Sequence, residues 1–230
     1  MSRIAIVGDV HGKIDLMLER TLELNVDVIM QVGDLGTFIF EERMDRAARK
    51  HDGIGNFVEY YSGKKQFPLP VYFIKGNHDD FNVLEEIKKG KIKNLNFMEN
   101  GTVDNICGKL FGALGGNYSR TRYDFNHNNS QLHGKRRKHF NHQDVEALEK
   151  FSNIYAIIAH DCPNEVGIKN KFDESDCGSP EVRAMIEKIQ PRFYFHGHHH
   201  CYTETMIGNT RAIGLGILEG ETQSIYVLEN

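Results

Sequence analysis

Five stretches of this 230-residue chain carry polar groups that can bind a metal ion. In chain order the groups are Asp9 and His11; Asp34; Asn77 and His78; His160; and His198 with His200. Carboxylate oxygen, amide oxygen and imidazole nitrogen together suit Mn, Fe, Zn or a similar divalent ion better than Ca or Mg. The set is too large for one ion. Asp34 is the best candidate to bridge two ions, because it stands alone in its stretch.

Each of these groups follows an apolar run that is typical of a buried strand. The runs are residues 3–7, 26–32, 71–74, 154–159 and 192–195, and segments compatible with a helix are 13–24, 41–51, 81–89, 144–151 and 180–189. Alternation of strand, loop and helix predicts βαβ units around a mainly parallel sheet. Since ligands bind at the carboxyl ends of strands in such sheets, the five groups are predicted to meet at one edge.

The pattern changes after residue 94. Short runs at 95–98, 102–107 and 109–114 have no helix between them, which predicts an antiparallel meander on a second sheet. Residues 115–141 are polar and show no period, and a loop of this length is usually functional or disordered. Further short strands are predicted at 201–206, 211–215 and 224–228. Without a repeat or a linker, residues 1–230 are predicted to form one domain.

The composition is that of an ordinary globular chain, with 40% hydrophobic residues and a formal charge of −4. Attraction of the whole molecule to nucleic acid is not expected, although a local basic patch could still act. Four widely spaced cysteines indicate free thiols in a reducing cytosol. The first residues turn polar too soon for a signal peptide, and no apolar run is long enough to span a membrane. A cytoplasmic protein without membrane association is expected.

Taken singly, each group has a simpler interpretation. A Gly-Asp pair after a strand is common, His160 alone could be a satisfied buried histidine, and the cluster around His198 could be a polar turn. Taken together, at five successive strand ends, coincidence is hard to defend.

The motifs at residues 8–12, 33–36, 76–79, 160 and 197–200 resemble those of the calcineurin-like metallophosphoesterase superfamily, in the same order. The resemblance implies an α/β (α+β) fold, a two-sheet β-sandwich flanked by helices, with a dinuclear site at one edge. It implies that Asp9, His11, Asp34 and His200 hold one ion and that Asp34, Asn77, His160 and His198 hold the other. It also implies that His78 is the catalytic histidine and that Asp79 orients it.

These residue types agree with that chemistry. Two ions about 3.5–4 Å apart can hold a phosphoryl oxygen and generate a hydroxide for in-line attack on phosphorus. The imidazole of His78 can protonate the leaving oxygen or stabilise charge on the phosphoryl oxygens. A carboxylate such as Asp79 would fix the orientation of the imidazole.

A narrower resemblance is to the catalytic domain of RNA lariat debranching enzymes, which hydrolyse the 2′–5′ phosphodiester of an intron branch point. It rests on residues 57–65, 76–79, 115–118 and 159–163. Those enzymes carry a recognition loop in the region of residues 115–141. Here that region holds basic and aromatic residues, which suit a phosphate backbone with splayed bases. The predicted substrate contacts are Tyr118, Arg120, Lys135 and Arg136; the alternative is a solvated surface loop.

Two departures from the lariat enzymes leave the substrate open. They have Cys where this chain has Asp9, and they continue into a C-terminal domain that is not expected here. Leu35 and Gly36 follow Asp34 in place of the Arg-Gly of protein phosphatases, which weighs against a phosphoprotein. The sequence thus favours a phosphodiester, with RNA or a nucleotide among the candidates. The alternatives are a phosphomonoesterase, a phosphoprotein phosphatase or a non-catalytic protein-binding scaffold of the same fold.

Overall fold

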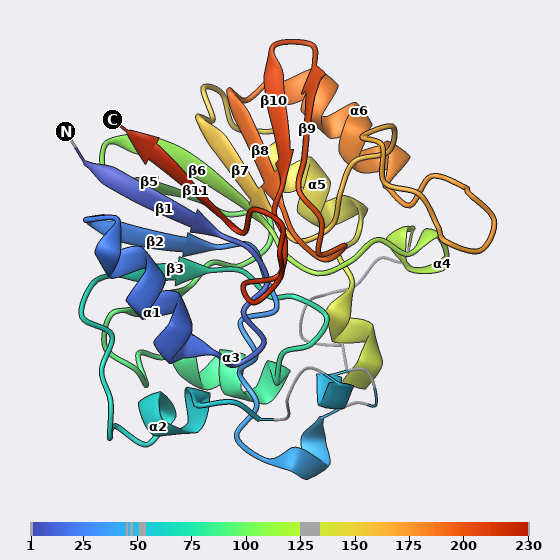
Figure 1. The fold of residues 1–230 in the computed structure, drawn as a ribbon. Helices are drawn as coiled ribbons and strands as arrows, with labels where there is room; N and C mark the ends of the chain where they lie inside the picture. Colours follow the sequence, from blue (N-terminus) through green and yellow to red (C-terminus); the bar gives the residue numbers. More distant parts are fainter. Residues whose placement is uncertain (1, 45, 47, 51–53, 125–133, 230) are drawn as a thin grey trace.

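Two β-sheets lie face to face, and helices cover their outer faces (Figure 1). The computed structural model describes residues 2–44, 46, 48–50, 54–124 and 134–229. The helices are α1 (Ile14–Glu23), α2 (Phe57–Tyr61), α3 (Phe81–Lys88), α4 (Arg120–Tyr123), α5 (His142–Leu148) and α6 (Pro180–Ile189), with 3-10 helices η1 (Glu41–Arg43), η2 (Ala48–Lys50) and η4 (Gly134–Lys138).

The first sheet has the strand order β11-β1-β2-β3-β4, and the second has the order β5-β6-β7-β8-β10-β9. The strands are β1 (Arg3–Val7), β2 (Val28–Gln31), β3 (Val71–Phe73), β4 (Leu95–Phe97), β5 (Val103–Ile106), β6 (Lys109–Leu114), β7 (Ala156–Ala159), β8 (Phe193–His196), β9 (Thr203–Ile207), β10 (Thr210–Gly214) and β11 (Ile225–Glu229). Strands β1 to β4 are parallel, and so are β6, β7, β8 and β10. Their carboxyl ends are therefore gathered at one edge of each sheet.

Successive side chains of a strand point to opposite faces of its sheet, and this explains how the sheets and helices pack in layers. Ile4 and Ile6 of β1 pack between the sheets with Met30 of β2, Ile158 of β7 and Phe195 of β8. The residues that alternate with them in β1 point the other way, into the apolar cluster under α1, α2 and α3. A third cluster lies between the second sheet and helices α5 and α6. Because β1 is buried on both faces, its sequence reads as a continuous apolar run.

The predicted fold class, a two-sheet α/β sandwich flanked by helices, is confirmed. One strand was assigned to the wrong sheet: β4 does not join a meander but pairs in parallel with β3, with Val71 opposite Leu95. Helix α3 supplies the crossover that a parallel pair needs, and the sequence analysis did not connect the two. The antiparallel pairing of β5 with β6 on the second sheet is as predicted.

Two predicted segments also differ from their expected form. The helix-compatible stretch 41–51 contains the short turns η1 and η2, and its residues 45, 47 and 51 lie outside the described part. The polar stretch 115–141 contains α4 and η4, and residues 125–133 are not described. Within the described residues, no helix is both long and apolar enough to cross a membrane. That residues 1–230 form one domain stays a prediction.

Candidate metal centre

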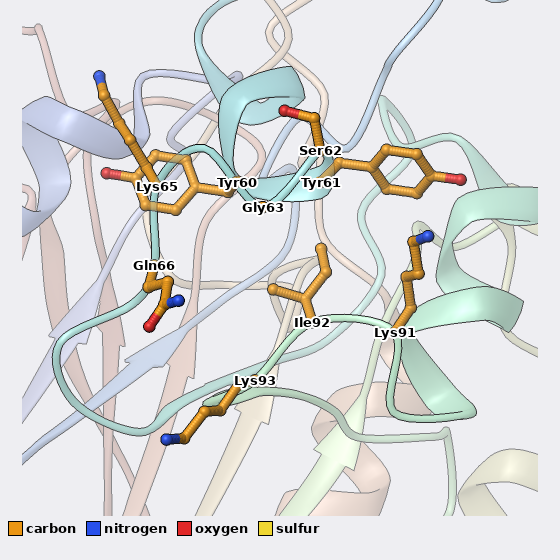
Figure 2. Close-up of a pocket in the computed structure, with 9 residues that line it drawn as sticks. All are labelled: Tyr60, Tyr61, Ser62, Gly63, Lys65, Gln66, Lys91, Ile92 and Lys93. Atoms are coloured by element: carbon orange, nitrogen blue, oxygen red, sulfur yellow. The ribbon is translucent and has the colours of Figure 1, made fainter.

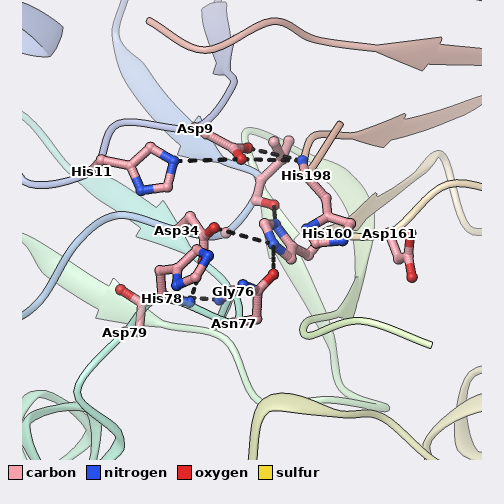
Figure 3. Close-up of polar contacts among 12 residues, drawn as sticks. Asp9, His11, Asp34, Gly76, Asn77, His78, Asp79, His160, Asp161 and His198 are labelled. Atoms are coloured by element: carbon pink, nitrogen blue, oxygen red, sulfur yellow. Dashed lines mark hydrogen bonds and ion pairs between the residues drawn. The ribbon is translucent and has the colours of Figure 1, made fainter. Parts of the chain in front are cut away.

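All five predicted groups lie in the loops that follow β1, β2, β3, β7 and β8 (Figure 3). Hydrogen bonds join the loops of the two sheets. The backbone N–H of His198, after β8, donates to Asp9 Oδ1, after β1, at 3.1 Å. His160, after β7, lies with Nδ1 3.0 Å from the carbonyl oxygen of Val32, after β2. The predicted convergence of distant residues at one edge is therefore present in the structure.

The side chains form two compact groups. Ligand atoms of Asp9, His11 and His200 all lie within 4.8 Å of one another. His200 Nε2 is 3.0 Å from Asp9 Oδ2 and 3.2 Å from His11 Nε2. The carboxylate of Asp9 is fully buried, whereas the side chain of His200 is 28% exposed. This group therefore has one side open to solvent.

The second group consists of Asp34, His160 and His198, whose ligand atoms also lie within 4.8 Å of one another. Asn77 adds an amide oxygen, since its Oδ1 is 3.1 Å from His160 Nε2. His160 Nε2 is 3.5 Å from Asp34 Oδ2, and both side chains are almost completely buried. A carbonyl oxygen can only accept, so Nδ1 of His160 carries the proton that faces Val32. That tautomer leaves Nε2 as the metal-binding nitrogen.

Electrostatics in the centre favour a bound cation. Burial acts to raise the pKa of Asp34, but the charge of the His160 imidazole prevails and lowers it. Burial acts to lower the pKa of His160, but Asp34 prevails and raises it to about 10. The pKa of Asp9 is likewise lowered against its burial, chiefly by His200. The buried carboxylates thus draw positive charge to the imidazoles, and divalent ions bound to the same atoms would supply that charge.

The backbone at the centre is held in rarely populated conformations. Four of the seven predicted ligands have a positive φ: His11 (48°), Asp34 (57°), His198 (64°) and His200 (53°). For residues other than glycine this region is uncommon, and such outliers cluster at functional sites. Their concentration on these residues supports a ligand-binding role for this edge.

Glycines next to the ligands are required by close packing. A Cβ on Gly76 would collide with the carboxylate and backbone of Asp34, and a Cβ on Gly197 would collide with the carboxylate of Asp9. The loops can approach the ligands only because these two positions carry no side chain.

Asp79 and His78 support the loop in different ways. The carboxylate of Asp79 accepts hydrogen bonds from the backbone N–H groups of Gly36 (2.9 Å), Thr37 (3.2 Å) and Gly76 (2.8 Å). Asp79 thereby ties the loop after β2 to the loop after β3, a role that the sequence analysis did not foresee. The backbone N–H of His78 donates to Asp34 Oδ1 at 2.6 Å. That Asp79 orients the imidazole of His78 stays a prediction.

A third group of potential ligands was missed by the sequence analysis. Asp161, Cys162 and His199 also have ligand atoms within 4.8 Å of one another. Burial raises the pKa of the Cys162 thiol well above its usual range, which disfavours the thiolate that metals need. Asp161 accepts from the backbone N–H of Tyr118 at 2.7 Å and lies 3.3 Å from His199 Nε2. The group therefore supports the loops beside the centre through hydrogen bonds. Its sequence signals were the adjacency of Asp161 and His199 to predicted ligands and the place of Asp161 and Cys162 in the stretch 159–163.

The segment predicted to bind substrate lies beside the loop after β3. Gly116 N–H donates to the carbonyl of Lys75 at 2.7 Å, and Lys75 Nζ donates to the carbonyl of His139 at 3.0 Å. Arg137 donates to the carbonyl of Phe81 at 2.7 Å and to Glu85 at 2.8 Å, which fixes η4 to the first turn of α3.

The predicted substrate contacts differ in their surroundings. The hydroxyl of Tyr118 donates to Glu181 at 2.8 Å, and its ring lies 6.1 Å from that of Phe140, so Tyr118 is engaged in packing. Arg120 and Arg136 are exposed, whereas the side chain of Lys135 lies outside the described part. The substrate-binding role of these four residues stays a prediction.

The sequence matches the model of the calcineurin-like phosphoesterase family over residues 2–202, and the chain belongs to this family. The match confirms the resemblance on which the prediction of a metal-dependent hydrolase rested.

Several relatives carry the name lariat debranching enzyme, among them proteins of Arabidopsis thaliana and Entamoeba histolytica. The Arabidopsis thaliana protein is 28% identical, over 86% of this chain and 54% of its own length. The Entamoeba histolytica protein is 26% identical, over 94% of this chain and 69% of its own length. This chain therefore spans about half the length of the Arabidopsis relative.

Solved structures support the fold. The protein TT1561 of Thermus thermophilus superposes with a TM-score of 0.57 at 15% identity, covering 94% of this chain and 90% of that one. GAP50 of Plasmodium, described as the anchor in the inner membrane complex, superposes with a TM-score of 0.52 at 13% identity, covering 100% and 75%. At these identities the likeness concerns the fold alone.

Proposed function

We propose that this chain hydrolyses phosphodiesters with two divalent ions held by the seven predicted ligands. One observation carries the proposal: two groups of three ligand atoms, each within 4.8 Å, lie at the same edge, with Asp34 in the second. The pKa of Asp34 is lowered, against burial, by His160 of the second group and also by His11 of the first. The influence of both groups on this carboxylate supports Asp34 as the ligand that the two ions would share.

When bound, the ions would activate water and neutralise charge at the phosphoryl group. The chain's own residues would position the proton donor, His78, and the loop that carries it. Asp34 accepts a hydrogen bond from the backbone N–H of His78, which holds that loop at the centre, and the His78 ring centroid lies 5.8 Å from that of His11. From there His78 would donate a proton to the leaving oxygen. Asp79 keeps the loop of His78 against the loop of Asp34.

A polynucleotide is the substrate that this proposal favours. The Arabidopsis and Entamoeba relatives named lariat debranching enzyme both match most of this chain. In addition, the η4 segment places Arg136 on the surface while Arg137 holds that segment against α3, next to the loop of His78. RNA with a 2′–5′ linkage is the first candidate.

The reaction class is tested with two aryl phosphates. The protein is reconstituted in turn with Mn, Fe, Zn, Ni and Co, and hydrolysis of bis-p-nitrophenyl phosphate is compared with that of p-nitrophenyl phosphate. Faster hydrolysis of the diester is expected. Preference for the monoester would favour a phosphomonoesterase, and no hydrolysis of either substrate with any metal would favour a non-catalytic scaffold.

The substrate is tested with matched RNA oligonucleotides that differ only in one 2′–5′ or 3′–5′ linkage, alongside cyclic nucleotides and dinucleotides. Selective cleavage at the 2′–5′ linkage is expected. Equal rates on all diesters would still agree with a phosphodiesterase, but they would contradict a specificity for 2′–5′ linkages.

A further inference from the structure

A pocket of about 230 Å³ lies between the end of α2 and the segment that leads into β4 (Figure 2). Tyr61, Lys65, Lys91 and Lys93 are among the residues that line it, and Ile92 lies between them in this view. Since the pocket adjoins the amino end of β4, it lies at the edge of the first sheet opposite the metal centre. None of the residues that line it has a part in the chemistry proposed above.

The positive charge of this pocket is not cancelled by its acidic neighbours. Lys65 lies 2.6 Å from both Asp15 and Glu59, so those carboxylates are neutralised. In the described part of the chain, no ion pair is found for Lys91 or Lys93, and both are exposed. Two cations therefore remain for an external anion.

Stabilisation of α3 does not explain these two lysines. Cations in the last turn of a helix interact favourably with its dipole, and the effect falls off within that turn. Lys88 occupies that position and pairs with Glu99 at 2.7 Å. Lys91 and Lys93 lie beyond the end of the helix at Lys88, with Gly90 between.

Lys91 is already oriented. Its Nζ lies 5.1 Å from the centroid of the Tyr61 ring, a cation–π distance. The ring is fixed because its hydroxyl donates to Glu86 at 2.7 Å. A fixed cation loses less conformational entropy when it binds an anion.

Helix α3 connects the pocket with the metal centre. It begins next to Asp80 and, with eight residues, is about 12 Å long. Two acidic side chains along it are paired with cations, Asp80 with Arg43 at 3.0 Å and Glu85 with Arg137, whereas Glu86 accepts a hydrogen bond from the neutral hydroxyl of Tyr61. A phosphate chain that leaves the metal centre along α3 would meet cations of η4 at one end and the lysine pocket at the other.

We infer that the pocket of Lys91 and Lys93 binds the phosphate backbone of a single-stranded polynucleotide whose scissile diester lies at the metal centre. The inference rests on the proposed function only for the statement that the bound strand is the substrate. At about 0.7 per contact, two backbone contacts contribute about 1.4 to the log–log salt slope, which makes their contribution to affinity about 25-fold larger at 0.1 M than at 1 M salt.

The test is the binding of a fluorescent single-stranded RNA to the metal-free protein, measured by anisotropy at several salt concentrations. The variant Lys91→Ala/Lys93→Ala is compared with Lys169→Ala/Lys171→Ala. The control pair has the same spacing and exposure, lies outside the pocket, and has no ion pair among the described residues. Weaker binding and a shallower salt slope are expected for the pocket variant alone, with binding restored in Lys91→Arg/Lys93→Arg.

Hydrolysis of bis-p-nitrophenyl phosphate separates this inference from the proposed function. It should be unchanged in the pocket variant, because the metal centre is intact. Equal RNA binding by the pocket and control variants would overturn the inference even in an active enzyme. If the protein hydrolyses no diester but the pocket variant still loses RNA binding, the proposed function fails and the polynucleotide site stands. Equal losses on RNA and on the aryl diester would also overturn the inference.

Discussion

The metal centre and the lysine pocket handle charge in opposite ways. In the metal centre, Asp9 and Asp34 are buried, strained loops hold the ligands, and each side chain contacts others of the set. In the pocket, Lys91 and Lys93 are exposed, and Lys91 lies over the ring of Tyr61. The difference teaches that a substitution in the centre disturbs several buried groups at once, whereas a substitution in the pocket removes chiefly the charge of the lysine that is replaced.

Loss of the shared carboxylate should have the largest effect. Asp34→Asn keeps the shape of the side chain but removes the charge next to both ligand groups. We expect activity on every substrate to fall to the rate of the metal-free protein and at least one equivalent of metal to be lost. Elemental analysis after reconstitution should give about two equivalents of metal per unmodified chain. A stable value near one equivalent in the unmodified chain would contradict the bridging role of Asp34.

Loss of the proposed acid should be the next largest effect and should spare the metals. His78 contacts Asp34 through its backbone N–H, so His78→Ala leaves that hydrogen bond in place. We expect kcat to fall by about 10²–10⁴-fold, the usual span for a positioned acid. Metal content should stay unchanged, and His142→Ala serves as a control imidazole outside the centre. If metal is lost together with activity, His78 is a ligand.

A single methyl group should test how tightly the centre is packed. In Gly76→Ala the new Cβ collides with Asp34, so we expect metal affinity and activity to fall by about 10–100-fold, as for other groups that orient ligands. Gly167→Ala is the control, since its Cβ would meet no atom within 4 Å although its φ is +84°. The control should cost about 1–2 kcal/mol of stability and no activity. Similar activity losses in both variants would show that contact with Asp34 is not the cause.

The smallest effect is expected from the η4 segment. Lys135→Ala/Arg136→Ala should raise the KM for an oligonucleotide severalfold and reduce the salt slope by about 0.7 per lost contact. Hydrolysis of the aryl diester should hardly change. Arg137→Ala is the contrast: it removes the bonds to Phe81 and Glu85 and should lower stability as well. If the double variant slows both substrates equally, the segment is structural.

The sequence predicted the convergence of the candidate ligands better than the contacts around them, for a physical reason. Apolar strands followed by Asp, His or Asn are local patterns, and parallel strands bring their carboxyl ends together. The hydrogen bonds by which Asp79 ties the loop after β2 to the loop after β3 join residues 43 positions apart, so no local pattern reveals them. The same holds for Asp161, whose partners Tyr118 and His199 lie in two other loops.

One error in the fold and one missed contact have a related origin. Strand β4 has only three residues, and its sequence alone does not say whether it continues a parallel sheet or starts a meander. The basic residues of the stretch 115–141 were predicted to contact substrate, with a solvated surface loop as the alternative, and neither interpretation foresees that Arg137 docks on α3. Pairing partners of short strands and docked surface cations are decided by tertiary contacts, which the sequence does not display.

The pairing of β1 with β11 has a practical consequence. Arg3 lies opposite Glu229, so the two ends of the chain meet side by side at the start of β1 (Figure 1). Asp9 comes just after the other end of that strand, at the metal edge. A label, a fused protein or a solid support attached to either end would therefore stay clear of the mouth of the centre. The same proximity would let a short linker close the chain into a ring without disturbing any ligand loop.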